Sequence, residues 1–208
     1  MPPPSAIAAQ PPAEAAHAAP GSLLHAASRW RVKAGQIGMA VGAAYLLILR
    51  VPPRDLLDGS ALSLLGLGLV LGGTLVRLAA MGTLKKNEQL ATTGVYSLCR
   101  HPLYLGSLFM ASGFSILFWS VVAASIVAAY FTVFYTVAIL REDRFLQQKF
   151  GAAFDEFRRT TPALLPMGRY RRGHFSWRQA IRWRGLNMFA TQGLLLALIQ
   201  AMHIRFTS

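Results

Sequence analysis

The chain has 208 residues, of which 54% are hydrophobic and only 14% charged, and its formal net charge is +13. Its mean hydropathy of +0.41 is high for a soluble domain and ordinary for a protein with several membrane spans. The basic residues gather at the ends of apolar segments rather than over one polar face, which favours a membrane protein and argues against a nucleic-acid-binding protein.

Residues 1–33 form an N-terminal stretch that starts Ala/Pro-rich and almost without charge. It shows neither helical nor strand periodicity, so we expect a disordered tail. A secretory signal is not expected there, because the stretch lacks a basic start and prolines interrupt its apolar residues.

Apolar runs then predict about five membrane-spanning helices, so the expected fold is an all-α transmembrane bundle. The runs are residues 34–49, 60–82, 102–117, 121–140 and 185–202. Because only residues 118–120 separate the third run from the fourth, these two should form an antiparallel helical hairpin. The second run carries glycines that would permit close contact with a neighbouring helix, namely Gly66, Gly68, Gly72 and Gly73.

The basic clusters orient these spans. If the spans alternate, residues 83–101 and 141–184 share one face, and the positive-inside rule makes that face cytosolic. We interpret residues 34–166 as the membrane-embedded core, 167–184 as a basic interfacial segment that contacts anionic lipid at 169–184, and 185–208 as a C-terminal transmembrane helix. The expected location is the inner membrane of a bacterium.

The stretch GVYSLCRHPLYLG interrupts the apolar chain with an Arg-His-Pro triplet. Pro102 can begin a helix, because its φ is already helical and its missing N–H would be unpaired in a first turn. The start of that helix, beside Arg100 and His101, is a natural seat for a carboxylate or phosphate. Tyr104 offers a hydroxyl, and Gly106 would clear space beside it. The structural alternative is that Arg100 extends to lipid phosphate while His101 caps the helix.

A second candidate follows the fourth span. If its helix continues, residues 142, 146, 150, 154 and 157 share one face, on which Glu142 precedes a leucine and three phenylalanines. We therefore expect Glu142 to point into the protein and Asp143 to lie about 100° round the helix. Glu142 is then the better ligand-binding candidate. The alternative is a structural ion pair of Glu142 with Arg100, Arg141 or Arg144.

Other kinds of site are not predicted. The histidines have no metal-ligand spacing and Cys99 is the sole cysteine, so we expect no metal. We interpret Cys99 as a buried filler rather than a nucleophile. The chain has no Gly-rich phosphate loop, dinucleotide fingerprint or serine elbow.

The segments LATTGVYSLCRHPLYLG and REDRFLQQKFGAAFDEFRRTTPALLP resemble the C-terminal half of the isoprenylcysteine carboxyl methyltransferases, which belong with the phospholipid methyltransferases. The family signature combines Gly-x-Tyr, Arg-His-Pro-x-Tyr-x-Gly, an acidic pair and Phe-Gly. The resemblance covers roughly residues 70–166 and includes Leu75 and Arg77. It implies a membrane-embedded, S-adenosylmethionine-dependent methyltransferase whose acceptor is a prenylcysteine-type carboxylate or a phospholipid amine.

The resemblance also implies a set of cofactor-binding residues. They are Gln89, Leu90, Ala91, Tyr96, His101, Pro102, Leu103, Tyr104 and Glu142, of which Gln89 and Ala91 match by position alone. In the prenylcysteine enzymes an arginine one turn before the acidic residue is thought to meet the substrate carboxylate, and that position is Ala138 here. The candidates for contact with substrate are therefore Arg100, Arg141 and Arg144.

With that cofactor, catalysis would consist mainly of aligning a lipid nucleophile for in-line displacement, without a metal or a covalent enzyme intermediate. The acceptor would enter from the bilayer and the cofactor from the cytosol. Two alternatives stay open: an NADPH enzyme similar to membrane sterol reductases, and a non-enzymatic membrane scaffold or transporter.

Overall fold

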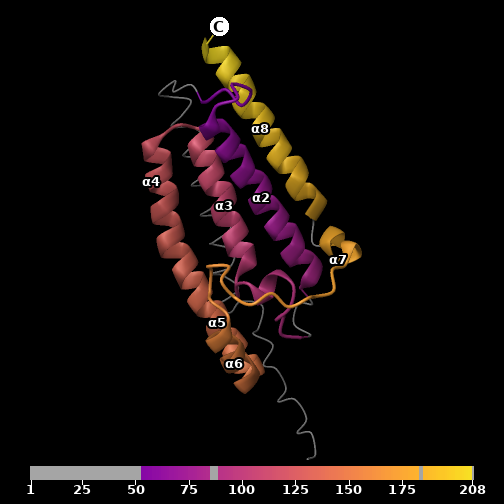
Figure 1. The fold of residues 1–208 in the computed structure, drawn as a ribbon. Helices are drawn as coiled ribbons and strands as arrows, with labels where there is room; N and C mark the ends of the chain where they lie inside the picture. The colour runs from indigo at the N-terminus through magenta and orange to yellow at the C-terminus, as the bar shows by residue number, and fades with distance from the viewer. Residues whose placement is uncertain (1–52, 85–88, 183–184, 208) are drawn as a thin grey trace, which may run out of the picture. The chain divides into compact units, whose positions relative to one another are not determined.

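The structure is a computed structural model that describes residues 53–84, 89–182 and 185–207. The chain divides into two units, Met1–Tyr45 and Leu46–Ser208, and all described residues belong to the second. They are all-helical (Figure 1), with one isolated β-bridge between Gly94 and Arg171 and no strand among them, which confirms the expected all-α class. The expected tail (1–33) and first span (34–49) lie outside the described residues.

The helices follow the apolar runs. The α-helices are α2 (Ala61–Thr83), α3 (Pro102–Leu117), α4 (Val121–Tyr130), α5 (Thr136–Phe150), α6 (Ala152–Thr160), α7 (Trp177–Arg182) and α8 (Gly185–Thr207). A short 3₁₀ turn, η1 (Val95–Ser97), precedes α3, and a π-helical segment, η2 (Phe131–Tyr135), joins α4 to α5. The expected runs at 60–82, 102–117, 121–140 and 185–202 therefore all coincide with helix. The helix that begins at Val121 continues to Phe150, and α8 continues to Thr207, so both extend beyond the predicted runs.

Local signals set the starts of the first two helices. The Ser60 side chain caps α2 by accepting a hydrogen bond from the backbone N–H of Ser63 at 3.2 Å. Pro102 stands at the start of α3, as expected. The turn before α2 is fastened to α8, because Asp55 accepts a hydrogen bond from Gln200 at 2.9 Å. This bond ties the beginning of the described chain to its end.

Helices α2 and α3 approach each other through glycines. The glycines at the contact are Gly66, Gly73, Gly106 and Gly113. A Cβ added at Gly73 would lie 2.5 Å from the carbonyl oxygen of Gly106, so neither position has room for a larger residue. Gly68 and Gly72 would have nothing within 4 Å of an added Cβ, so they do not serve the contact that we expected of them.

Gly106 has a different role from the expected one. A Cβ there would lie 2.6 Å from Cγ of Arg77 and 2.7 Å from the carbonyl oxygen of Gly73, so the glycine makes room for α2 rather than for a ligand beside Tyr104.

Two of the described helices are long and apolar enough to cross a membrane. They are α2, with a mean hydropathy of 1.9, and the continuous segment Ala124–Phe150, with 1.6. Only 33% and 11% of their most apolar windows are buried, whereas a core helix of a soluble protein would be mostly buried. Apolar side chains this exposed suit lipid as their surroundings. Helix α3 is apolar but shorter, and a total of five spans stays a prediction.

The helix after the fourth span does not continue as expected. It ends at Phe150, because Gly151 has a φ of +51°, a conformation that residues with a Cβ rarely adopt. The expected apolar face is thus split between two helices, in which Phe154 and Phe157 are buried while Glu142 is exposed. The expectation that Glu142 points into the protein is therefore wrong.

We expect Gly73→Leu to destabilise the protein by about 1–3 kcal/mol, because its side chain would collide with the backbone of α3. Gly72→Leu adds the same side chain to open space and should leave stability close to wild type. Thermal unfolding of the detergent-solubilised variants, followed by tryptophan fluorescence, measures the difference. Equal losses in both variants would contradict the role given to this contact.

Candidate functional site

The loop that leads into α3 is held by a later segment of the chain, residues 161–176, which we call the strap. Backbone hydrogen bonds join the strap to Gly82 and to residues 94–101: Arg100 N to Pro162 O, His101 N to Ala163 O, Gly168 N to Leu98 O, Gly94 N to Arg171 O, and Ser176 N to Gly82 O. Gly168 is required in the strap, because a Cβ there would collide with the carbonyl oxygen of Ser97. The strap therefore fixes the backbone that carries the Arg-His-Pro triplet.

Asp143 on α5 is the buried acid of the site. Its Oδ2 accepts a hydrogen bond from Nη2 of Arg100, and its Oδ1 lies 2.9 Å from Nε2 of His101. The side chains of Asp143, Arg100 and His101 are only 8%, 9% and 2% exposed. A carboxylate in this position compensates the charge of Arg100, which otherwise would be costly to bury. The expectation that Asp143 lies away from the interior is wrong for the same reason as for Glu142.

Both terminal nitrogens of Arg100 bond to the protein's own groups, while its buried Nε has no hydrogen-bond partner among the described residues. Besides Asp143, its Nη1 donates to the backbone carbonyl oxygens of Arg158 and Thr161, both at 3.0 Å. Arg100 therefore links the start of α3 to α6 and the strap, rather than extending to lipid.

His101 lies between two acids. Its Nε2 faces Asp143, and its Nδ1 lies 3.7 Å from Oε2 of Glu142, whose side chain is 46% exposed. An ionised Asp143 can only accept, so Nε2 carries a proton and Nδ1 is the nitrogen turned toward Glu142. Glu142 thus remains accessible next to a histidine whose orientation is fixed by the contact of its Nε2 with Asp143.

Tyrosines complete the cluster. The ring of Tyr104 stacks on His101 with centroids 5.6 Å apart, and it also meets Tyr135 of η2 edge-on at 5.0 Å. Tyr96 is buried, and both its burial and the charge of Glu142 raise the pKa of its hydroxyl, so it stays protonated. Tyr135 was not predicted, although a tyrosine inside an apolar run is a polar group that needs a partner.

Most of the residues expected to hold the cofactor are thus brought together. His101, Tyr96, Tyr104 and Glu142 form one cluster, and Pro102 and Leu103 lie in the first turn of α3 beside it. The other three precede η1, where Gln89 is exposed and Leu90 and Ala91 are half-buried. Among the described residues, no side-chain hydrogen bond joins those three to the cluster.

Cys99 is buried beside the triplet, and burial raises the pKa of its thiol to about 11. The thiolate form is therefore disfavoured, which agrees with the interpretation as a filler.

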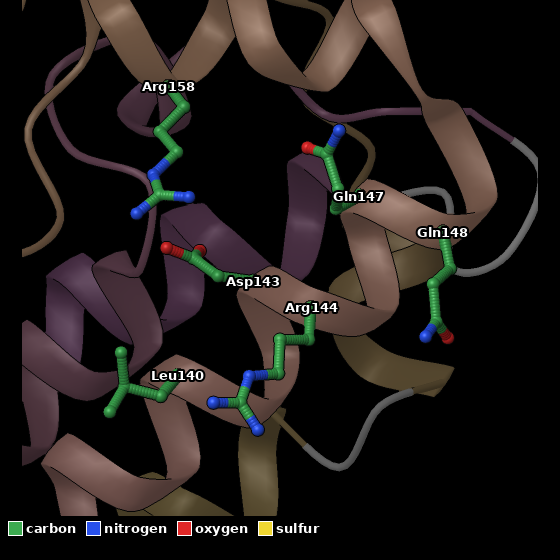
Figure 2. A pocket seen from close by; sticks show the side chains of 6 residues that line it. All are labelled: Leu140, Asp143, Arg144, Gln147, Gln148 and Arg158. Atoms are coloured by element: carbon green, nitrogen blue, oxygen red, sulfur yellow. The ribbon is translucent and has the colours of Figure 1, made fainter.

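A cavity of about 360 Å³ adjoins the cluster at Asp143. Its lining residues come from α5 and α6 and are Leu140, Asp143, Arg144, Gln147, Gln148 and Arg158 (Figure 2). The figure shows the Arg158 guanidinium extending toward the Asp143 carboxylate. Of the expected substrate contacts, Arg144 lines this cavity and Arg141 is exposed. Ala138, at the position where the prenylcysteine enzymes have an arginine, is buried.

The described residues thus combine two helices long and apolar enough to cross a membrane with a buried polar cluster at the start of α3. Residues 59–153 match the family model of the phospholipid methyltransferases. The family resemblance predicted from the sequence is therefore confirmed for this segment.

Curated relatives fall into two groups. The chain is 38% identical over 117 residues to the cobalt-zinc-cadmium resistance protein CzcN of Cupriavidus metallidurans, which is 52% of this chain and 54% of that protein. It is 39% identical over 82 residues to the nickel-cobalt-cadmium resistance protein NccN of Alcaligenes xylosoxydans xylosoxydans (39% of this chain, 38% of that protein). It is 28% identical over 82 residues to the protein-S-isoprenylcysteine O-methyltransferase of Schizosaccharomyces pombe (39% and 35%). The chain thus spans about half the length, or less, of these relatives, and no solved structure matches it.

We expect Asp143→Asn to lower the stability by about 3 kcal/mol or more, because it leaves the buried Arg100 without a counter-charge. Glu142→Gln removes the same charge from the preceding, half-exposed position and should change the stability by no more than about 0.5 kcal/mol. Thermal or denaturant unfolding of the purified variants measures both. A larger loss for Glu142→Gln than for Asp143→Asn would overturn this assignment.

Proposed function

We propose that this chain is an integral-membrane methyltransferase that uses S-adenosylmethionine and methylates a lipophilic acceptor. The observation that carries the proposal is the cluster of His101, Tyr104 and Glu142 at the start of α3. The cluster lies within the segment that matches the phospholipid methyltransferases, and methyltransferases of this kind typically use that cofactor.

The donor set fits the charged parts of S-adenosylmethionine. No side chain caps the N-terminus of α3, where Pro102 has no N–H and Tyr104 N donates to the carbonyl oxygen of His101, so the N–H of Leu103 would hold the carboxylate. Glu142 would hold the amino group, since its side chain is 46% exposed and its 3.7 Å contact with Nδ1 of His101 is longer than a hydrogen bond. The faces of Tyr104 and Tyr135 would border the adenine. Arg100, an expected partner of the carboxylate, is occupied by Asp143.

The chemistry assigned to the residues is alignment and proton handling. The cofactor, when bound, supplies an electrophilic methyl group. A carboxylate acceptor needs no base, whereas an amine acceptor must lose a proton before or during transfer. His101 is positioned for that step, because Asp143 holds its Nε2 and leaves Nδ1 facing the site.

The proposed arrangement in the membrane follows the charge pattern. The cluster and the strap lie on the cytosolic face, and the exposed Arg169, Arg171 and Arg172 of the strap contact anionic lipid. The acceptor enters from the bilayer, and residues 34–49 and α8 supply the remaining spans of an inner-membrane protein.

We expect purified protein to bind labelled S-adenosylmethionine saturably, and His101→Ala and Glu142→Ala to weaken binding by about tenfold or more, as expected for lost charge-assisted hydrogen bonds. Glu156→Ala, which removes an exposed acid of α6, is the matched control and should bind like wild type. Absence of saturable binding in a folded, monodisperse wild-type sample would refute the proposal.

The acceptor is identified in the same preparation. The protein is incubated with a membrane lipid extract and the labelled cofactor, and the labelled product is analysed by mass spectrometry. A base-labile methyl ester identifies a carboxylate acceptor, whereas a base-stable methylamine identifies a phospholipid amine. Label in soluble products alone would contradict a lipophilic acceptor.

The two metal-resistance relatives favour a second candidate, a contribution of methyl transfer to metal resistance. We expect the wild-type chain to improve growth of a metal-sensitive bacterium on zinc, cobalt or cadmium, and His101→Ala at equal expression to fail. Equal growth with both proteins would show that metal resistance does not depend on His101 and the proposed site.

A further inference from the structure

Arg77 is a charged residue within an apolar, membrane-crossing helix. It lies six residues before the last residue of α2, Thr83, which is about 9 Å along the helix axis. A basic residue at such a depth is costly unless it has a partner or a task, and an arginine cannot avoid the cost by losing its proton. Arg77 therefore requires an explanation that the proposed cofactor site does not supply.

The partners of Arg77 are all neutral. Its Nη1 donates to the carbonyl oxygen of Leu103 at 3.1 Å and to Oγ of Ser107, and its Nε donates to Sδ of Met188 at 3.4 Å. The ion pairs found among the described residues all belong to the Arg100 and His101 cluster. Within the described ranges, then, no acid compensates the guanidinium charge.

The packing gives this side chain a defined path. Gly106 on α3 lies directly against Cγ of Arg77, where a Cβ would come within 2.6 Å. The next residue, Ser107, is one of the hydrogen-bond acceptors. The guanidinium is thereby held against the first half of α3, whose first turn carries Tyr104.

Arg77 also lies within electrostatic reach of the proposed site. The charges of Arg77 and Glu142 both act on the buried hydroxyl of Tyr96, and Arg77 interacts in the same way with Tyr135. The hydrogen bond to the carbonyl oxygen of Leu103 places the guanidinium at the first turn of α3, which also carries Tyr104.

We propose that Arg77 binds an oxyanion of the lipid acceptor, a carboxylate or a phosphate, and so determines which acceptors the site takes. This inference rests on the proposed methyltransferase function. A fixed, desolvated guanidinium with neutral neighbours attracts an oxyanion more strongly than the same group in water. The acceptor's charge then completes an ion pair that the described residues leave open, and a neutral lipid gains nothing there.

The test uses oleate and dioleoyl phosphatidate as anionic probes and oleamide as the neutral one, each labelled and bound to the protein in a neutral detergent. We expect one or both anions to bind saturably and Arg77→Gln to weaken that binding by about tenfold or more. Arg77→Lys, which keeps the charge, should lose less. Arg159→Gln removes an exposed arginine of α6 as the matched control and should bind like wild type.

Three results would overturn the inference. The first is equal anion binding by wild type and Arg77→Gln, and the second is a loss of oleamide binding in Arg77→Gln as large as its loss of anion binding. The third is displacement of oleate by inorganic phosphate at equal concentration, which would indicate a site for soluble anions. If Arg77→Gln is not monodisperse, Arg77→Met, which also removes the charge, is compared with wild type by the same criteria. S-adenosylmethionine binding is measured in parallel and should stay within about twofold of wild type in Arg77→Gln. Loss of cofactor binding in wild type refutes the proposed function, whereas retained cofactor binding with unchanged anion binding refutes only the role of Arg77.

Discussion

The carboxylate of Asp143 is the group on which the site depends, because it bonds Arg100 and His101 at once. These bonds join α5 to the start of α3 across the whole intervening hairpin. Arg100 also donates to carbonyl oxygens of α6 and the strap, so this one side chain connects α5, α6 and the strap. The neighbouring Glu142 keeps a 46% exposed side chain. Under the proposed function, the two acids would thus divide support and binding between them.

The close contact of α2 and α3 has a second consequence, for the distribution of charge. Glycine at Gly73 and Gly106 lets the helices approach until the Arg77 side chain lies against α3. On one side of the first turn of α3 the positive charge of Arg100 is compensated by Asp143, while on the α2 side the charge of Arg77 has only neutral partners. Both arginines lie beside α3, but only Arg77 lacks a carboxylate partner among the described residues. Of the two, Arg77 is therefore the one expected to attract an anionic ligand.

The sequence predicts the helices well, because long apolar runs and Pro102 are strong local signals. It predicts the site only in part. Choosing between Glu142 and Asp143 required the helix to be continuous, and the left-handed Gly151 breaks it. Gly72 and Gly73 are equivalent in the sequence until the position of α3 is known. The strap binds through backbone groups, which leave no pattern in the side chains.

The chemistry of the acceptor follows from how Arg77 and His101 would share it. If the methylated atom belongs to a carboxylate, the anion bound by Arg77 is itself the nucleophile, and His101 has no proton to take. If the acceptor is a phospholipid amine, its phosphate would bind Arg77 while the amine, a few bonds away, reaches Nδ1 of His101. The first case uses one cation, and the second uses both groups at a separation set by the lipid headgroup. An acceptor with both an anion and an amine therefore makes the fuller use of the groups that this fold brings together.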